Sequence, residues 1–89
     1  MTIGEAIDAA RARLVAAGFT PGDAAIDARV LAGEALGFDR TMLVVRGADP
    51  ADPSAVDRLD ALLARRVARE PVAYILRRRE FYGRDFSVS

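Results

Sequence analysis

The sequence predicts a mainly α-helical fold, a small orthogonal bundle of about five helices followed by a C-terminal β-hairpin linker. Two observations support this prediction. Through residues 1–76, apolar side chains recur at spacings of three and four residues between capping residues and glycines. In residues 77–89, short aromatic stretches flank a Gly-Arg pair instead. We therefore expect a helical domain over 1–76 and a hairpin linker over 77–89.

The first helix is predicted from Thr2, because Thr2 and Glu5 have the spacing of a capping box. Gly18 supplies the left-handed residue that ends the helix, and Phe19 can fold back on its last turn. The apolar residues at helical spacing are Ile3, Ile7, Ala10, Leu14 and Ala17.

Thr20 and Pro21 predict the start of a second helix, which Gly37 ends. Its apolar face is formed by Ala24, Ala28, Leu31 and Ala35. Ile26 and Val30 widen this face, so the helix is predicted to be buried on more than one side. The carboxylates at 23 and 27 are expected at the helix start or on a solvated face, although Asp27 lies between apolar positions.

A short third helix is predicted from Asp39 to Gly47, followed by a polar loop over residues 48–54. The Asp52-Pro53 pair opens a fourth helix with a strong apolar face, formed by Val56, Leu59, Leu62, Leu63 and Val67. Pro71 interrupts the helical pattern, because the residue before a proline avoids helical backbone angles. Residues 72–76 are then predicted to form one further helical turn.

The last residues predict two short strands, 80–82 and 85–88, joined by Gly83-Arg84. A two-residue turn with glycine first is typical of a type II′ hairpin. A hairpin of this size is marginal alone in water, so it is expected to pack on the helices or to continue into something larger.

Composition excludes several functions. The chain has neither Cys nor His, which excludes disulfides, zinc sites built on those residues, and thiol or imidazole catalysis. It has no phosphate-binding loop, nucleophile elbow or metal-ligand spacing, so no catalytic, cofactor-binding or metal-binding residue is predicted. No apolar run is long enough to span a membrane, and a cytoplasmic location is expected.

Charge is divided unevenly along the chain. Residues 1–60 hold 6 Arg and 10 acidic residues, whereas residues 61–89 hold 7 Arg and 3 acidic residues. The basic end is the best candidate for a binding surface. The residues predicted to bind a partner are Arg65, Arg66, Arg69, Arg78 and Arg79. The alternative is a solvated helix end whose arginines pair with the acids at 70, 80 and 85.

Residues 59–88 resemble the end of the amino-terminal domain of the HemK family, the release factor glutamine methyltransferases. The shared order is a helix ending in Ala64-Arg65-Arg66, then residues 69–76 (REPVAYIL), then residues 80–83 (EFYG) and an aromatic strand. The family usually has Gly where this chain has Arg77, which predicts that Arg77 occupies a backbone position suited to glycine.

The resemblance implies a helical substrate-recognition domain, a hairpin linker and a separate methyltransferase domain that binds S-adenosylmethionine. The implied partners are class I peptide chain release factors, methylated on the Gln of a Gly-Gly-Gln motif. Two alternatives come from other classes. One is a stand-alone helical adaptor or oligomerisation module; the other is a small nucleic-acid-binding domain, disfavoured because few aromatics are interleaved with the cations.

Overall fold

The computed structural model describes residues 1–76, which form four α-helices and a final helical turn. The helices are α1 (Ile3–Ala16), α2 (Pro21–Leu36), α3 (Arg40–Val45) and α4 (Pro53–Val67), and the turn covers residues 72–76. The prediction of a mainly α, small helical bundle is confirmed. The predicted hairpin and Arg77 lie outside the described residues.

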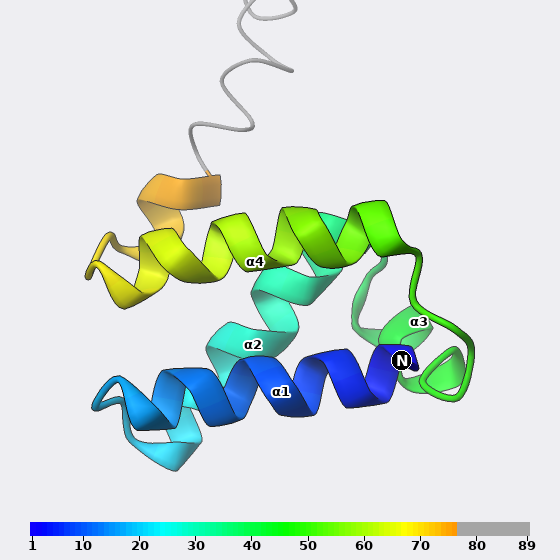
Figure 1. The fold of residues 1–89 in the computed structure, drawn as a ribbon, viewed down its shortest axis with the longest axis horizontal. Coiled ribbons are helices and arrows are strands. Elements are labelled where there is room, and N and C mark those ends of the chain that lie inside the picture. Colours follow the sequence, from blue (N-terminus) through cyan, green and yellow to red (C-terminus); the bar gives the residue numbers. More distant parts are fainter. Residues whose placement is uncertain (77–89) are drawn as a thin grey trace, which may run out of the picture.

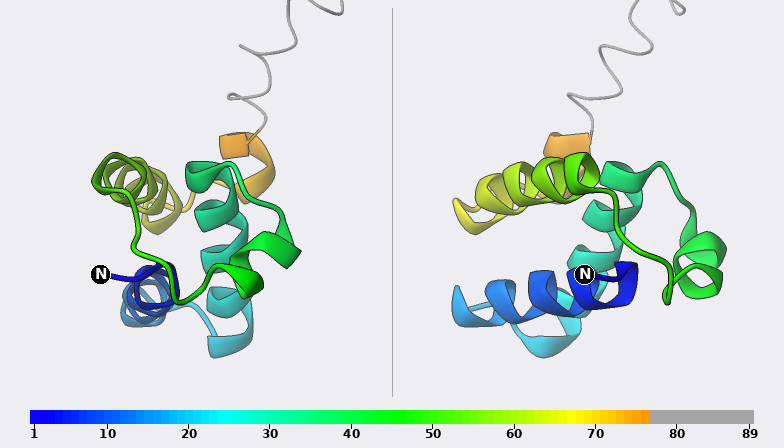
Figure 2. Two further views of the ribbon diagram at one scale, coloured as in Figure 1. Left: turned by 90° about the vertical axis from the view of Figure 1, so that its right-hand side faces the viewer. Right: turned by 45° about the vertical axis from the view of Figure 1, so that its right-hand side comes forward.

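In the bundle, α1 and α4 lie side by side and run in the same direction, while α2 crosses behind both (Figure 1). Figure 2 shows the short α3 beside α2, and α3 also contacts α1. Helix α2 therefore packs against each of the other three helices. Within residues 1–76, no helix is long and apolar enough to cross a membrane.

The start of α1 satisfies its free backbone donors in two ways. The Glu5 N–H donates to Thr2 Oγ1 at 3.1 Å, and the Thr2 N–H donates to Glu5 Oε1 at 2.7 Å, as the capping box predicts. The N–H groups of Ile3 and Gly4 donate to carbonyl oxygens in the loop at residues 47–49. The hydrogen bonds with Thr2 lower the pKa of the Glu5 carboxyl, whose contribution to stability is therefore lost as the pH falls through that lowered value.

Thr2→Ala is expected to lower the free energy of unfolding by about 1 kcal/mol, because the Glu5 N–H loses its acceptor at the helix start. Urea unfolding followed by circular dichroism measures this loss. Thr41→Ala is the matched control, since Thr41 is exposed and does not cap a helix. Equal effects of the two substitutions would contradict a capping role for Thr2.

Glycines in the left-handed region end the first two helices. Gly18 has φ 104° and Gly37 has φ 75°, the backbone conformation that glycine adopts without steric cost. The Phe19 N–H then donates to the carbonyl oxygen of Leu14, and the Phe38 N–H donates to a carbonyl of α2. Both predicted helix ends are confirmed.

The core lies where α2 crosses α1 and α4. Helix α2 contributes five buried residues, four of them alanines, which let neighbouring backbones approach closely: Ala24, Ala28, Leu31, Ala32 and Ala35. The largest fully buried side chains are Leu14, Leu31 and Ile75. Because Ile75 belongs to the final helical turn, this turn is fastened to the bundle core.

Predicted caps also begin the last two helices. Asp39 accepts a hydrogen bond from the Met42 N–H at 2.8 Å, and Asp52 accepts one from the Ala55 N–H at 3.3 Å. A further contact was not predicted from the sequence. Arg58 of α4 donates from Nε (3.0 Å) and Nη2 (2.8 Å) to the Ala35 carbonyl, satisfying an acceptor near the end of α2.

Candidate partner-binding surface

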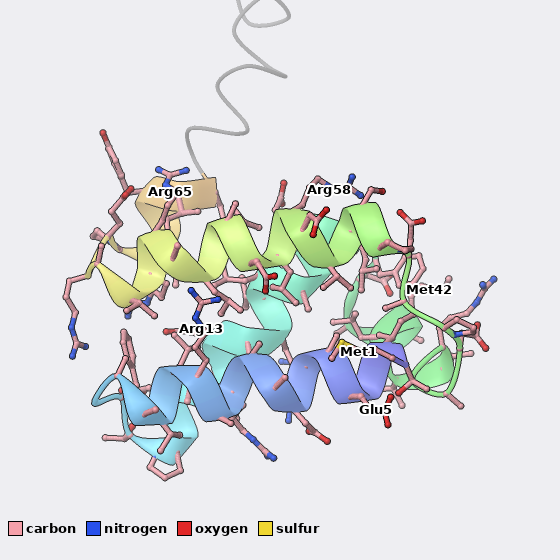
Figure 3. All side chains as sticks on the ribbon, viewed as in Figure 1. Met1, Glu5, Arg13, Met42, Arg58 and Arg65 are labelled. Carbon is pink, nitrogen blue, oxygen red and sulfur yellow. The ribbon has the colours of Figure 1, made fainter. Side chains whose placement is uncertain are left out.

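The basic surface predicted from the sequence begins at the carboxyl end of α4. The described arginines of this surface are Arg65, Arg66 and Arg69, whereas Arg78 and Arg79 lie outside the described residues. Figure 3 shows Arg65 at the end of α4, beside the final helical turn. Arg65 and Arg66 lie in the last turn of α4 and Arg69 lies just beyond its end, and each makes different contacts.

Arg69 has a positive φ of 75°. The Glu70 N–H donates to the Arg65 carbonyl (3.1 Å) and the Arg69 N–H donates to the Arg66 carbonyl (2.9 Å), which is the pattern of a Schellman motif. A residue with a side chain has a steric cost of about 1 kcal/mol in this conformation. Sequence reasoning predicted such a residue at Arg77 but missed Arg69, because helix-ending rules favour glycine there.

Arg65 forms a two-pronged ion pair with Glu70. Its Nη2 lies 2.7 Å and its Nε 3.1 Å from Glu70 Oε1, and both side chains are about one-third exposed. The hydrogen bonds that Arg65 donates to the Glu70 carboxylate are the main cause that raises the pKa of Arg65. This ion pair links the last turn of α4 to Glu70, which lies just after the helix ends.

Arg66 joins α4 to α2. Its Nε donates to Asp27 Oδ2 at 2.9 Å, and its Nη1 donates to the Glu70 carbonyl at 2.9 Å. The Arg66 and Asp27 side chains are only 21% and 14% exposed. The expectation that Asp27 sits at a cap or on a solvated face is therefore wrong, because the carboxylate faces a cation from another helix.

Phe19 lies against the guanidinium groups of both Arg66 and Arg69. The ring centroid is 4.7 Å from the Arg66 Cζ and 4.3 Å from the Arg69 Cζ, within the range of cation–π attraction. The Arg69 Nη2 also donates to the Ala17 carbonyl at 2.8 Å. The arginines thus hold the turn between α1 and α2 against the end of α4.

The ion pairs leave an uneven charge at this end of the bundle. Glu70 offsets Arg65 and Asp27 offsets Arg66. In residues 1–76 no carboxylate lies within ion-pairing distance of Arg69, whose side chain is exposed enough to present its charge to solvent. The role of these arginines in partner binding stays a prediction, but their role in holding the bundle together is directly visible.

A groove between α2 and α3 was not predicted from the sequence. It has a volume of about 550 Å³, and its apolar lining includes Ile26, Val30, Phe38, Leu43 and Leu76. Ile26 is 59% exposed and Val30 is 38% exposed, so the prediction that these two residues widen the buried face of α2 is wrong. Within residues 1–76, α3 covers only part of the face of α2 that carries them. In the same residues, no group of three or more acidic side chains could hold a metal ion.

Comparison with known proteins decides the family. The model of the PrmC N-terminal domain family matches residues 5–76. The chain belongs to this family. The resemblance to release factor glutamine methyltransferases is thereby confirmed, and the match includes the whole bundle from the first turn of α1 to Leu76.

Curated relatives carry the name release factor glutamine methyltransferase. The protein of Burkholderia pseudomallei is 46% identical over 65 residues, covering 73% of this chain and 23% of the relative. The protein of Cereibacter sphaeroides is 43% identical over 89 residues, covering 100% of this chain and 31% of the relative. The chain therefore spans between about a quarter and a third of the length of these relatives. No solved structure matches the chain.

Proposed function

We propose that this chain is the protein-substrate recognition domain of a release factor glutamine methyltransferase. The observation that carries the proposal is the family match over residues 5–76, together with relatives named for that activity. The reaction of such an enzyme transfers a methyl group from S-adenosylmethionine to the side-chain amide of a glutamine. The cytoplasm, where release factors act in translation, is the proposed location.

The described residues do not fit S-adenosylmethionine. In residues 1–76 the elements are helices, so the strand and glycine-rich turn that usually cradle a nucleotide-like cofactor are missing from this part of the chain. We assign cofactor binding and methyl transfer to the remaining two-thirds or more of the enzyme, as judged from the relatives. The helical domain then contributes by holding the release factor.

Binding of the release factor by the helical domain raises the rate of methyl transfer without any contact with the reacting atoms. A glutamine in a large protein must be presented to the methyl donor in one orientation, and binding energy from a remote surface can hold it there. We propose that the surface at the end of α4 takes part in this binding through Arg65, Arg66, Arg69, Arg78 and Arg79. Since Arg65 and Arg66 are paired internally, Arg69 contributes most of the unpaired charge among the three described arginines of this surface.

Calorimetric titration of this chain with a class I release factor tests the proposal. Saturable binding is expected, and Arg69→Gln should weaken it by roughly threefold to tenfold at low salt, the order expected for one charge at an interface rim. The loss should shrink as salt increases. Arg69→Lys is the matched control, because it keeps the charge but loses the flat guanidinium over Phe19.

The possible outcomes separate the binding surface from the function. Absence of saturable binding by the folded chain would overturn the proposed function. If the Arg69→Gln variant binds the release factor as tightly as the unchanged chain at every salt concentration, the proposed function stands. Arg69 would then serve only to hold the bundle together. Weakening by Arg69→Lys as large as that by Arg69→Gln would assign the effect to the contact with Phe19 instead of charge.

A further inference from the structure

The Arg69 side chain is held in one position by the turn between α1 and α2. The centre of the Phe19 ring lies 4.3 Å from the Arg69 Cζ, and the Ala17 carbonyl accepts a hydrogen bond from Nη2 at 2.8 Å. Gly18 leaves room for the guanidinium, because a Cβ at this position would lie only 3.1 Å from Nη2. The guanidinium is therefore fixed by a turn that lies some 52 positions earlier in the chain.

The backbone of Arg69 adopts this arrangement at a steric cost. Its φ of 75° lies in the left-handed region, where residues with a side chain are uncommon. Glycine would end α4 at this position without the cost. Backbone strain of this kind occurs mainly at ligand-binding and other functional positions, where the surrounding structure enforces it. The presence of arginine at position 69 is thus explained by its side chain and not by its backbone.

The guanidinium of Arg69 keeps donors for a ligand. Among residues 1–76, its side chain donates one hydrogen bond, to the Ala17 carbonyl, and no carboxylate of these residues lies within ion-pairing distance. Arg69 is exposed, so a group from another molecule can reach it. The N–H donors of a guanidinium form a planar fork that matches the two oxygens of a carboxylate.

The charges around Arg69 favour a carboxylate over a nucleic acid. Arg65 is paired with Glu70, and Arg66 is paired with Asp27. Nucleic acids are bound through several cations that neutralise successive phosphates, whereas the described residues at this end of α4 leave one arginine unpaired. A single fixed guanidinium instead suits one aspartate or glutamate side chain of a protein.

We propose that Arg69, held by the turn at residues 17–19, is a preformed binding site for one acidic side chain of the release factor. This inference rests on the proposed function and names the chemical group that the partner supplies. Phe19 is 8% exposed and is a positioning residue, which acts through Arg69. Because a side chain that is already fixed loses less conformational entropy on binding, the ring of Phe19 strengthens the interaction.

A double-mutant cycle on the affinity for a class I release factor tests the role of Phe19. Phe19→Leu keeps an apolar side chain but removes the ring face, and it should weaken binding by roughly twofold to fivefold, the value of one exposed cation–π contact. In the Arg69→Gln background, Phe19→Leu should weaken binding no further. Phe19→Tyr keeps the ring face and should bind like the unchanged chain.

Phe38→Leu is the matched control for Phe19→Leu. Phe38 follows Gly37 as Phe19 follows Gly18, and each phenylalanine N–H donates to a carbonyl of the helix before it. Phe38 lines the groove between α2 and α3 instead of facing the arginines, so its replacement should leave the affinity unchanged. Circular dichroism checks that each variant is folded at the temperature of the titration.

A charge exchange identifies the group on the partner. Surface aspartates and glutamates of the release factor are replaced by arginine, one at a time, and each variant is titrated with the unchanged chain and with Arg69→Glu. One replacement should weaken binding to the unchanged chain, and Arg69→Glu should restore part of the loss for that replacement alone. This measurement does not require the Phe19→Leu variant to fold.

The contrary outcomes are distinct. An equal loss from Phe19→Leu in both backgrounds would show that the ring only stabilises the bundle, and it would overturn the inference. Failure of Arg69→Glu to restore binding to any release factor variant would overturn it too, as would duplex RNA binding that depends on Arg69. These results leave the proposed function standing. A release factor that does not bind the folded, unchanged chain would overturn the proposed function, and the inference with it.

Discussion

Leu31→Ala is expected to lower the free energy of unfolding by about 2 to 5 kcal/mol, the range for truncating a fully buried leucine. Leu31 is 0% exposed and lies on α2, the helix that packs against all the others. The neighbours cannot collapse into the space easily, because much of the surrounding core is alanine on fixed helix backbones. For a domain of this size the melting temperature should fall by roughly 10 to 20 °C or more.

Thermal and urea unfolding, both followed by helical circular dichroism, measure this loss. Val44→Ala provides the control, because Val44 is 75% exposed on α3 and its truncation should cost less than about 1 kcal/mol. A Leu31→Ala variant as stable as Val44→Ala would mean that α2 is not the centre of the core. A folded but weakened variant is the expected result, since the caps of the other helices remain intact.

The helix boundaries could be predicted because their causes are local. Each helix start depends on a side-chain oxygen and a backbone N–H three residues later, and these are neighbours in the sequence. The capping residues seen in the structure are Thr2, Thr20, Asp39 and Asp52. The glycine ends of α1 and α2 likewise need only one residue with positive φ. The type and spacing of these residues were therefore sufficient to predict where the helices begin and end.

The exposed face of α2 could not be predicted in the same way. Apolar periodicity shows which side chains share a face of a helix, but it does not show whether another element covers that face. Ile26 and Val30 are as apolar as core residues, yet residues 1–76 leave them in a groove. The short α3 covers only the part of α2 near Leu43 and Phe38.

Polar contacts between residues far apart in the sequence could not be predicted either. Arg66 and Asp27 are 39 positions apart, and Arg58 reaches a carbonyl 23 positions away. The described arginines of the predicted basic cluster, Arg65, Arg66 and Arg69, do lie at one end of α4, but the sequence did not show that they face Phe19 and two carboxylates. The one signal in the sequence that this carboxylate is partly buried was the position of Asp27 between apolar residues.

The contact between α2 and α4 leads to the second large effect. Asp27→Ala is expected to lower the free energy of unfolding by about 2 kcal/mol, because Arg66 keeps its charge at 21% exposure without its carboxylate partner. This value is below the ~3 to 5 kcal/mol for a fully buried pair, since water still reaches both groups. Asp23→Ala, on the exposed first turn of the same helix, should cost well under about 1 kcal/mol.

A double-mutant cycle separates loss of the pair from loss of packing. Asp27→Leu with Arg66→Met replaces the two charges by apolar groups of similar length, so no uncompensated cation remains. The double variant should be more stable than the sum of the single changes predicts, by about 1 to 2 kcal/mol in urea unfolding. Strict additivity would mean that the Arg66 side chain is stabilised mainly by Phe19 and the Glu70 carbonyl, with Asp27 contributing little.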